Sequence, residues 1–361
     1  MVLLLQYGLI ESAIHGPGKI HDNRFVKAQR KMNDDDRAGQ QLGVYRLIRL
    51  LGRGMYSEVY FGEHLHLNYP VAIKILSGRF TSNEVKKFLV HASTLAQLQH
   101  PHIVRVIDLG LEDNIPFLVM EYAPNGNVRQ FHPKGTRVPL ETVISYVRQI
   151  AGALDYVHKQ KLIHRDIKPH NMLLGSANDI LLSDFGIAIT SHSIDTIRSD
   201  DFEGTVVYTA PEQLQGRSNR SSDQYALGVV VYEWLTGEWP FTGSFTEVAR
   251  QHLLVSPPGL CEKNSAISAA VEKVVLKALA KDATKRFANV QQFADALQRA
   301  GQAEKQPLAH PELKPLPMPK HQFMSPLPFA PLPVDESKHA SERAMDILTR
   351  LANGAYASDV P

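Results

Sequence analysis

The stretch HRDIKPHN, His164–Asn171, decides the fold of this chain together with DFG, Asp184–Gly186, which begins thirteen residues after Asn171. These short segments hold two acids and one amide. Such side chains offer oxygen ligands for a hard cation and a carboxylate that can act as a base. Mg²⁺ prefers oxygen ligands and keeps phosphate oxygens in its coordination shell. The two segments therefore predict a site that handles phosphate groups.

A glycine-containing segment upstream fits the same chemistry. Gly52-Arg53-Gly54 is followed by the alternating residues Val59, Tyr60 and Phe61, which are typical of a strand. A dinucleotide-binding fingerprint would instead be followed by a helix. A glycine turn between two strands can fold over phosphates and offer backbone N–H groups, although an ordinary hairpin turn has the same pattern.

Lys74 lies within the apolar segment Val71-Ala72-Ile73-Lys74-Ile75-Leu76. A lysine flanked by apolar residues in a strand needs a partner for its charge, and phosphate oxygens would supply one. A lysine on an edge strand is the alternative, and the residues alone leave both readings open.

Hydrophobic periodicity divides the chain into a strand-rich and a helix-rich part. The order of strands before helices predicts two lobes rather than a doubly wound sheet. One helix, 83–99, is expected to begin at an N-cap of Ser82 or Asn83. Strands are expected at 45–54, 58–64, 71–76, 103–109 and 116–121, and further helices at 140–159, 222–236, 245–254, 267–280 and 289–299.

Composition excludes several classes of protein. Thirty-nine basic residues against 37 acidic ones give no electrostatic reason to expect nucleic acid or an anionic membrane as the main partner. No apolar run approaches the roughly 18 residues that a membrane span needs. The single cysteine, Cys261, excludes an intrachain disulfide and suits a reducing compartment, so we expect a cytoplasmic protein.

Both ends of the chain differ from the middle. Residues 1–40 lack periodicity and are expected to be a poorly ordered extension; Met32 is an alternative start to Met1. Nine prolines fall between Pro307 and Pro333. The region 301–361 is therefore expected to be a disordered proline-rich tail, with one short helix at 337–352. A spacer is the favoured role, and a ligand for an aromatic-groove domain is the alternative.

The order of these motifs resembles the eukaryotic-like serine/threonine protein kinases found in bacteria. Glycine loop, VAIK lysine, HRD-type loop, DFG and Ala210-Pro211-Glu212 follow one another over roughly 45–300. The resemblance implies an α+β, two-lobed kinase fold with a β-rich N-lobe, 45–123, and an α-helical C-lobe, 124–300. It implies transfer of the γ-phosphoryl of ATP to Ser or Thr hydroxyls of proteins. Many bacterial relatives carry a membrane span after such a tail, and its absence here points to a soluble kinase.

The resemblance also implies roles for single residues. Asp166 would orient the substrate hydroxyl and accept its proton, Lys168 would neutralise the transferred phosphoryl group, and Lys74 would hold the ATP phosphates. Asn171 and Asp184 would bind Mg²⁺. The remaining implied nucleotide contacts are the glycine loop, the apolar faces around adenine, the gatekeeper and the hinge: Gly52, Gly54, Leu51, Val59, Ala72, Leu173, Met120, Glu121 and Ala123.

Scaffold and regulatory positions follow the family pattern too. Glu212 and Arg286 match an ion pair of the large lobe, and Asp223 matches the aspartate that holds the catalytic-loop backbone. Arg165 before Asp166 suggests that phosphorylation orders the segment from Asp184 to Glu212. We expect two copies to associate and phosphorylate one another there; the candidates are Thr190, Ser191, Ser193, Thr196, Ser199 and Thr205.

The main departure from the family is His91, which stands where a glutamate should pair with Lys74. A neutral imidazole could still accept a hydrogen bond from the lysine. Glu84 lies about 10 Å away along the helix and is a poor substitute. We favour a working kinase; the alternatives are a nucleotide-binding signalling scaffold with little activity and an adaptor that works through its tail. Asn127 and His170, at positions that are acidic in kinases preferring basic substrates, argue against an Arg-rich substrate motif.

Overall fold

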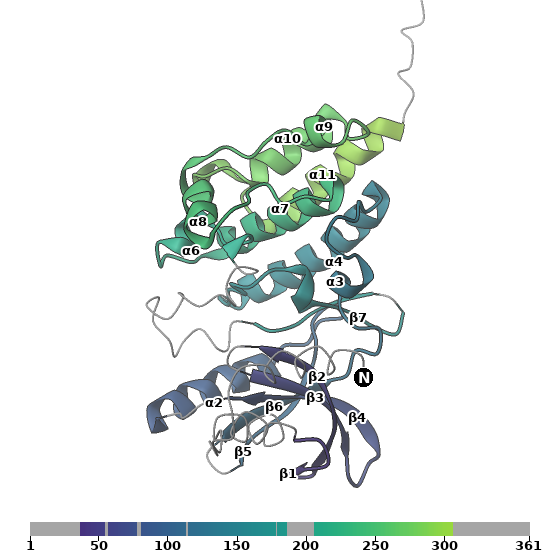
Figure 1. The fold of residues 1–361 in the computed structure, drawn as a ribbon, viewed down its shortest axis with the longest axis vertical. Helices are drawn as coiled ribbons and strands as arrows, with labels where there is room; N and C mark the ends of the chain where they lie inside the picture. The colour runs from purple at the N-terminus through teal and green to yellow at the C-terminus, as the bar shows by residue number, and fades with distance from the viewer. Residues whose placement is uncertain are drawn as a thin grey trace, which may run out of the picture. The chain divides into compact units, whose positions relative to one another are not determined.

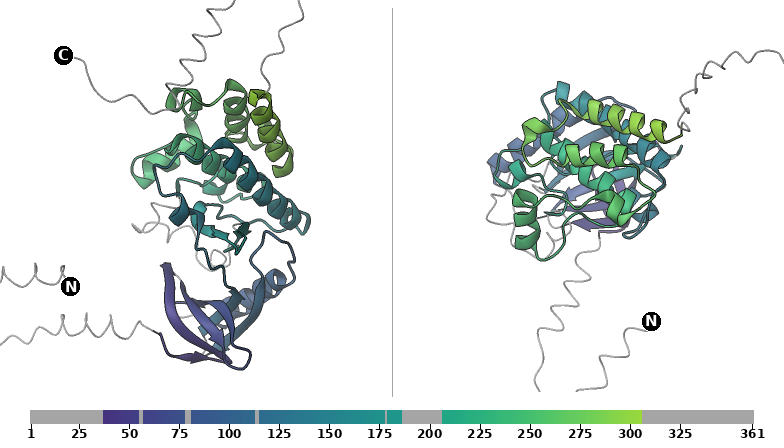
Figure 2. Two further views of the ribbon diagram at one scale, coloured as in Figure 1. Left: turned by 90° about the vertical axis from the view of Figure 1, so that its right-hand side faces the viewer. Right: turned by 90° about the horizontal axis from the view of Figure 1, so that it is seen from above.

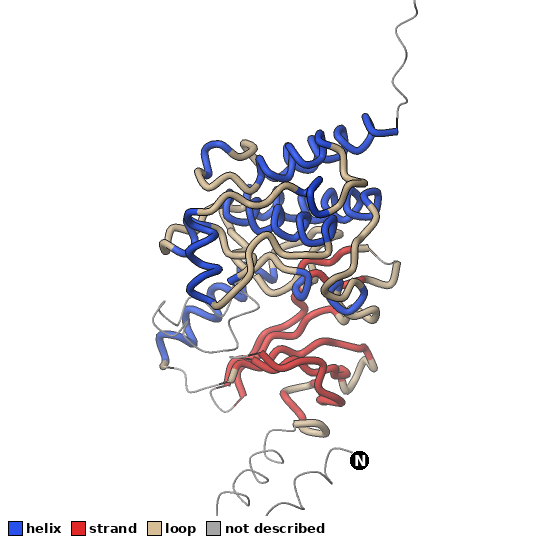
Figure 3. The backbone as a smooth tube through the Cα atoms, turned by 45° about the horizontal axis from the view of Figure 1, so that its top comes forward, coloured by secondary structure: helices blue, strands red, loops and turns tan. Residues whose placement is uncertain are grey.

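The structure, a computed structural model, gathers the strands toward one end and most of the helices toward the other (Figures 1 and 3). It describes residues 37–54, 57–77, 81–112, 115–177, 179–185 and 206–305. All of them belong to one compact unit, which ends at Pro307. The expected N-terminal extension up to residue 36, the segment 186–205 and the tail from 306 with its helix at 337–352 lie outside the described residues. The expected α+β division into a β-rich first part and a helical second part is confirmed.

The first part is a six-stranded antiparallel sheet with the strand order β1-β2-β3-β4-β6-β5. Neighbours in sequence pair as hairpins except across the connection that contains helix α2. The strands are β1 Gln41–Leu42, β2 Tyr45–Gly54, β3 Ser57–His64, β4 Tyr69–Leu76, β5 Val106–Glu112 and β6 Ile115–Glu121.

Strand β4 has two different faces, because alternate residues of a strand point to opposite sides of the sheet. Val71 and Ile73 are buried in a small core on one side. Ala72 and Leu76 belong to the larger core on the other side. Lys74 has the same strand parity as these two, so it leaves the sheet on the face of Ala72.

Helix α2, Ser82–Ala96, is the helix of the first part and packs against β5 and β6 (Figures 1 and 2). It begins one residue earlier than expected. The N-cap is Thr81, which forms a capping box with Glu84: the Thr81 hydroxyl accepts from the Glu84 backbone, and the Glu84 carboxylate accepts from the Thr81 backbone at 2.7 Å. The predicted N-cap at Ser82 or Asn83 is therefore wrong, because the reciprocal pair at 81 and 84 satisfies two backbone donors.

The strand expected at 103–109 lies further along, as β5. Residues 103 and 104 instead contact Leu182 of a second, two-stranded sheet, β7 Met172–Leu174 with β8 Ile180–Leu182. The backbone N–H of Val104 donates to the Leu182 carbonyl at 3.0 Å. The segment between α2 and β5 thus forms a backbone hydrogen bond with the second part of the fold before the chain enters the main sheet.

Helix α7, Arg220–Thr236, is the centre of the helical part, because every residue from Ser222 to Thr236 is buried. Gly228 lets α10 approach it closely, since a Cβ at this glycine would lie 3.2 Å from the Ala278 side chain. The other helices are α3 Val128–Phe131, α4 Leu140–Lys159, α6 Pro211–Leu214, α8 Phe245–Leu254, α9 Leu260–Lys263, α10 Ala269–Ala278 and α11 Val290–Lys305, with 3₁₀ turns η1 Pro169–Asn171 and η4 Ala283–Lys285.

The expected helices agree with these bounds to different degrees. Helices α4 and α8 have the expected limits. Helix α11 continues to Lys305 instead of ending at 299, so residues 301–305, which we assigned to the tail, are helical. The reason is packing against α4: a Cβ at Gly301 would lie 2.6 Å from the side chain of Ile144. In the described part of the chain, we find no helix long and apolar enough to span a membrane.

A buried ion pair ties α6 to the turn before α11. The Arg286 guanidinium donates to both Glu212 carboxylate oxygens, at 2.7 and 2.9 Å, and its side chain is fully buried. The Ser222 hydroxyl donates to the same carboxylate at 2.7 Å. Burial alone would raise the pKa of Glu212, but the hydrogen bonds and charge of Arg286 outweigh it and the pKa lies below its ordinary value.

We expect Glu212→Gln to lower the free energy of unfolding by about 3 kcal/mol, because it leaves the buried Arg286 guanidinium without its counter-charge. Glu238→Gln is the control, since Glu238 is 58% exposed and pairs with Lys263 on the surface; its cost should stay below about 1 kcal/mol. Urea unfolding at pH 7 measures both. The Glu212 contribution should be complete above its unfolded pKa and disappear as the pH falls through the lowered folded pKa. Equal losses in the two variants would contradict this account.

Candidate active site

A loop between α4 and β7 carries the central residues of the site and is held by one buried carboxylate. Asp223, in the first turn of α7, is 1% exposed. It accepts the backbone N–H groups of His164 and Arg165 at 2.9 and 2.8 Å. It also contacts Nε2 of His158 at 2.7 Å, and since a carboxylate only accepts, Nε2 carries the proton. Asp223 thus fixes the loop backbone just before Asp166, as expected from the sequence.

Three of the predicted catalytic residues, Asp166, Lys168 and Asn171, contact one another. The Lys168 ammonium lies 2.9 Å from the Asp166 carboxylate. The Asn171 side-chain amide donates to both the carbonyl and the carboxylate of Asp166, each at 2.8 Å. This geometry fixes the Asp166 side chain between a cation and an amide donor. Because its N–H₂ group is engaged in this way, the amide oxygen is the side-chain atom of Asn171 that could bind a cation.

Lys74 reaches across from β4 to Asp184. Its ammonium donates to the Asp184 carboxylate at 2.5 Å. Burial pushes the pKa of Asp184 upward, but the Lys74 charge and hydrogen bond, with smaller contributions from His164 and Lys168, bring it below its ordinary value. Asp184 is therefore ionised at neutral pH. The fourth predicted catalytic residue, Lys74, is thus joined to the site through the second acid.

Backbone hydrogen bonds tie the two acid-bearing segments together. The N–H of Ser183 donates to the Asn171 carbonyl at 2.9 Å. The ring Nε2 of His164, fully buried, contacts the Ser183 carbonyl at 2.9 Å. These two contacts fix Ser183, the residue before Asp184, relative to Asn171 and His164.

The donor set fits Mg²⁺. A carboxylate and an amide oxygen are hard ligands, and Mg²⁺ completes its shell with water and phosphate oxygens. No cluster of three or more His, Cys, Asp or Glu side chains that could hold a metal occurs among the described residues. A cation bound by Asn171 and Asp184 would therefore take its remaining ligands from substrate and solvent.

The residues expected around a nucleotide come from both parts of the fold. Leu51 lies on β2, Val59 on β3, Ala72 on β4 and Leu173 on β7. Gly52 lies on β2, and a Cβ there would meet no atom of the described residues within 4 Å. Gly54 is the last residue of β2 before the turn.

The expected hinge follows β6. Met120 is largely buried and Ala123 lies just past the strand. The backbone N–H of Glu121 already donates to the Arg105 carbonyl at 2.9 Å, so this N–H is not available to a ligand. Recognition of adenine by Glu121 would have to use its carbonyl.

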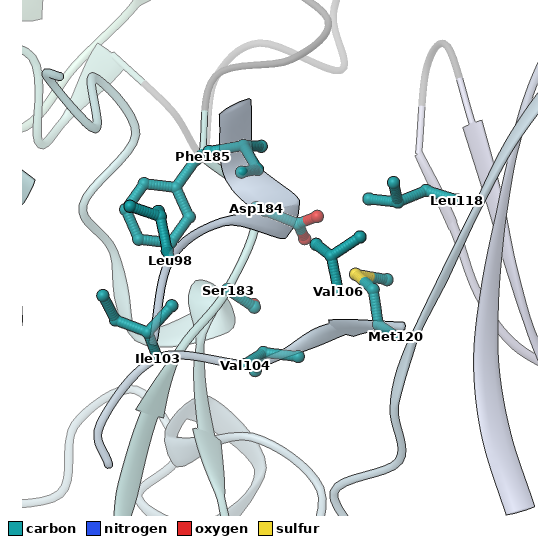
Figure 4. A pocket seen from close by; sticks show the side chains of 10 residues that line it. Leu98, Ile103, Val104, Val106, Leu118, Met120, Ser183, Asp184 and Phe185 are labelled. Carbon is teal, nitrogen blue, oxygen red and sulfur yellow. The ribbon is translucent and has the colours of Figure 1, made fainter. Parts of the chain in front are cut away.

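A small apolar cavity lies behind Met120 (Figure 4). The Phe185 ring lies beside Leu98 there, and the Asp184 carboxylate points away from that ring. Leu95 of α2 also lines the cavity. Helix α2 therefore touches the segment that carries Asp184.

His91 does not replace the missing glutamate as a partner of Lys74. The Lys74 ammonium is bound by Asp184 instead, and the Glu84 carboxylate is used by the capping box. Nε2 of His91 is buried without a hydrogen-bond partner, and burial together with the nearby Arg165 charge lowers the pKa of its ring. The sequence contained no signal for the contact between Lys74 and Asp184, because these residues lie far apart in the chain.

A buried network beside the loop was also missed. The Arg129 guanidinium donates to both Glu233 carboxylate oxygens, at 2.7 and 2.9 Å, and to the Tyr208 hydroxyl at 2.6 Å. Tyr208 in turn donates to Glu233 at 2.6 Å. Partial desolvation of the His170 ring and the Arg129 and Lys168 charges lower its pKa, although the residue as a whole remains exposed. Thr205 and the other candidate phosphorylation positions lie outside the described residues.

Comparisons with known proteins agree with this geometry. The family model described as protein kinase domain matches residues 45–299. Similar curated proteins include the serine/threonine-protein kinase PrkC of Bacillus subtilis, 34% identical over 267 residues, which are 73% of this chain and 41% of that protein. PknB of Mycobacterium tuberculosis, also named a serine/threonine-protein kinase, is 35% identical over 271 residues, 72% of this chain and 43% of that protein. The chain spans about two fifths of the length of these relatives.

We expect Asp223→Ala to loosen the catalytic loop. Losing the acceptor for two buried backbone N–H groups should cost about 2–4 kcal/mol of unfolding free energy and speed amide hydrogen exchange at His164 and Arg165 at least about tenfold. Asp155→Ala is the matched control, because Asp155 pairs with the exposed Lys159 on the surface of α4. Unchanged exchange at residues 164 and 165 in the Asp223 variant would show that other contacts hold the loop.

Proposed function

Because the chain belongs to the protein kinase family, we propose that it is a serine/threonine protein kinase that transfers the γ-phosphoryl of ATP to protein hydroxyls. The observation that carries this proposal is the arrangement at Asp166, with Lys168 at 2.9 Å and Asn171 bonded to it at 2.8 Å. A base, a cation and a metal ligand held together by partly buried hydrogen bonds form the constellation that phosphoryl transfer needs.

In the proposed reaction Asp166 orients the substrate hydroxyl and accepts its proton. The hydroxyl oxygen forms a bond to the γ-phosphorus while the bond to the bridging oxygen breaks, and ADP leaves. The Lys168 ammonium offsets negative charge on the phosphoryl group in transfer, and Lys74 holds the other phosphates. Positioning and charge compensation supply most of the rate, since the protein forms no covalent bond.

Mg²⁺, when bound, would offset the negative charge of the phosphates. We propose Asn171 and Asp184 as its protein ligands. The apolar faces of the cleft would enclose adenine, and the hinge backbone would bind its edge. The proposed nucleotide-binding residues are Leu51, Gly52, Gly54, Val59, Ala72, Lys74, Met120, Glu121, Ala123 and Leu173.

Substrates and partners are proposals as well. Proteins with Ser or Thr are the substrates, and a second copy of this chain is one of them if segment 186–205 is phosphorylated in trans. A groove domain is a candidate partner of the proline-rich tail, which lies outside the described residues. A cytoplasmic location is supported by the single cysteine, Cys261.

A nucleotide-binding scaffold with little transfer remains the second candidate, because His91 stands in place of the expected glutamate. Such a protein would bind ATP but transfer little phosphate, and substitution of Asp166 would not change the amount transferred. The two functions therefore differ in one measurable property, the incorporation of γ-phosphate.

We expect Asp166→Asn to reduce transfer from γ-labelled ATP by about 10²–10⁴-fold, because the amide cannot accept the proton. Labelling of the chain itself and of a generic Ser/Thr protein measures transfer, and mapping by mass spectrometry identifies the sites. Asp179→Asn, on the turn before β8, is the control and should keep activity. Equal incorporation by the wild type and the Asp166 variant would reject the enzyme.

Removing the cation should also stop the reaction. We expect excess EDTA to abolish incorporation and Mg²⁺ to restore it, because the phosphates then lose their main counter-charge. Asp184→Asn should need a concentration of Mg²⁺ at least about tenfold higher for half-maximal rate, since a neutral oxygen replaces a charged ligand. A rate that is insensitive to EDTA would contradict the proposed metal site.

A further inference from the structure

Arg165, the residue before Asp166, has a backbone conformation that needs support from its surroundings. Its φ of +70° lies in the left-handed region, which is unfavourable for a residue with a Cβ. Such a conformation persists where surrounding contacts fix it. Because Asp166 comes next in the chain, the same contacts decide where its carboxylate lies.

The peptide group on the N-terminal side of Arg165 is held by Asp223. The Asp223 carboxylate accepts the Arg165 N–H at 2.8 Å. This contact leaves the other side of the residue free to turn, because rotation about the bond from Cα to the carbonyl carbon moves the next peptide group without moving the first. A second contact, beyond the Cα of Arg165, is therefore needed to fix Asp166.

That second contact comes from Gln213. Its side-chain Nε2 donates to the Arg165 carbonyl at 2.7 Å. This carbonyl belongs to the peptide group that joins Arg165 to Asp166, and the N–H of the same group donates to Nδ1 of His164 at 3.3 Å. Nδ1 can accept because the other ring nitrogen, Nε2, gives its proton to the Ser183 carbonyl. Both polar atoms of the peptide group before Asp166 are thus hydrogen-bonded, and the shorter bond is the one from Gln213.

Helix α6 is a rigid support for this contact, because the residue next to Gln213 is anchored in the core. Glu212 accepts two hydrogen bonds from the buried Arg286 guanidinium, at 2.7 and 2.9 Å. Gln213 follows in the same helical turn, and its backbone N–H donates to the Ala210 carbonyl at 3.0 Å. Its bond to Arg165 is partly buried, so water competes with it less than at the surface. The ion pair therefore fixes the backbone from which the Gln213 side chain extends to the loop.

We propose that Gln213 is a positioning residue that holds the peptide group before Asp166 and so keeps the Asp166 carboxylate aligned with the substrate hydroxyl. The contact itself rests on the structure alone, whereas its consequence for transfer rests on the proposed kinase function. Asp223 and Gln213 then act from opposite sides of Arg165, since each fixes one of the two peptide groups that flank this strained residue. Gln213 acts through Asp166 and does not take part in the reaction itself.

Two substitutions separate this hydrogen bond from the packing of the side chain. Gln213→Met keeps the length of the side chain and removes the N–H donor. Gln213→His, studied at pH 8, is the conservative rescue, because its neutral ring can present an N–H at a similar distance from the backbone. Gln215→Met is the matched control, because Gln215 is also a glutamine, follows α6 directly and is exposed. Thermal unfolding of the full chain verifies that each variant is folded.

The first measurement needs no activity: amide hydrogen exchange at Asp166 in the full chain, because this N–H belongs to the peptide group that Gln213 holds. We expect Gln213→Met to speed the exchange about tenfold, the effect of losing one hydrogen bond. Exchange at Leu227, buried in α7, should not change, which excludes a general loosening of the fold. Gln213→His should stay within about threefold of the wild type, and Gln215→Met should not differ from it.

The second measurement is transfer from γ-labelled ATP to a generic Ser/Thr protein. We expect Gln213→Met to lower kcat by about tenfold or more and to leave the KM for ATP within about threefold, because the hydrogen bond positions Asp166 and not the nucleotide. Gln213→His should recover most of kcat.

Three results would overturn the proposal: a folded Gln213→Met variant with unchanged exchange at Asp166, the same variant with unchanged kcat, or a His variant as impaired as the Met variant. The proposed function fails separately. If the wild type transfers no phosphate while exchange at Asp166 still depends on residue 213, then the contact stands and the kinase activity does not.

Discussion

The geometry of the site depends on the hydrogen bonds that the buried Asp223 carboxylate accepts. Asp223 lies in the first turn of α7, where the helix dipole favours a negative charge, and it accepts the backbone N–H groups of His164 and Arg165. Arg165 has a φ of +70°, so the loop passes through a strained residue immediately before Asp166. A central helix buried on all sides is a rigid support for such a carboxylate. The position of the proposed base is thus set by the packing of the helical core.

The hydrogen-bond network extends from Asp166 to Asp184 through neighbouring peptide groups. Asn171 is bonded to Asp166, its carbonyl accepts the Ser183 N–H, and the Ser183 carbonyl contacts the His164 ring. Asp184 follows directly. Asp166 and the residue before Asp184 therefore belong to one network of hydrogen bonds. Lys74 joins this network from the sheet, so the contact between the two parts of the fold is also a contact within the site.

Periodicity predicted the local features, and the family pattern predicted two long-range contacts, Glu212 with Arg286 and Asp223 with the catalytic-loop backbone, but neither predicted the partner of Lys74. The period of two in β4 was enough to place Ala72 and Lys74 on one face, and the spacing of HRDIKPHN was enough to bring Asp166 and Asn171 together. Lys74 pairs with Asp184, which lies 110 residues further along the chain, and local spacing could not predict that pair. The family pattern indicated an acid on the helix, whereas the ion pair formed with Asp184. Helix ends shifted for a similar reason, because caps and tertiary contacts, not periodicity, decide where a helix begins and ends.

The charge of Lys74 is balanced without a carboxylate at position 91. Lys74 already has the Asp184 carboxylate as its counter-ion, so a second carboxylate would leave the pair with an excess negative charge close to incoming phosphates. A neutral imidazole avoids that repulsion. What is lost is a direct contact between the helix and the lysine, so in the proposed reaction Lys74 would be drawn to the phosphates by their charge alone.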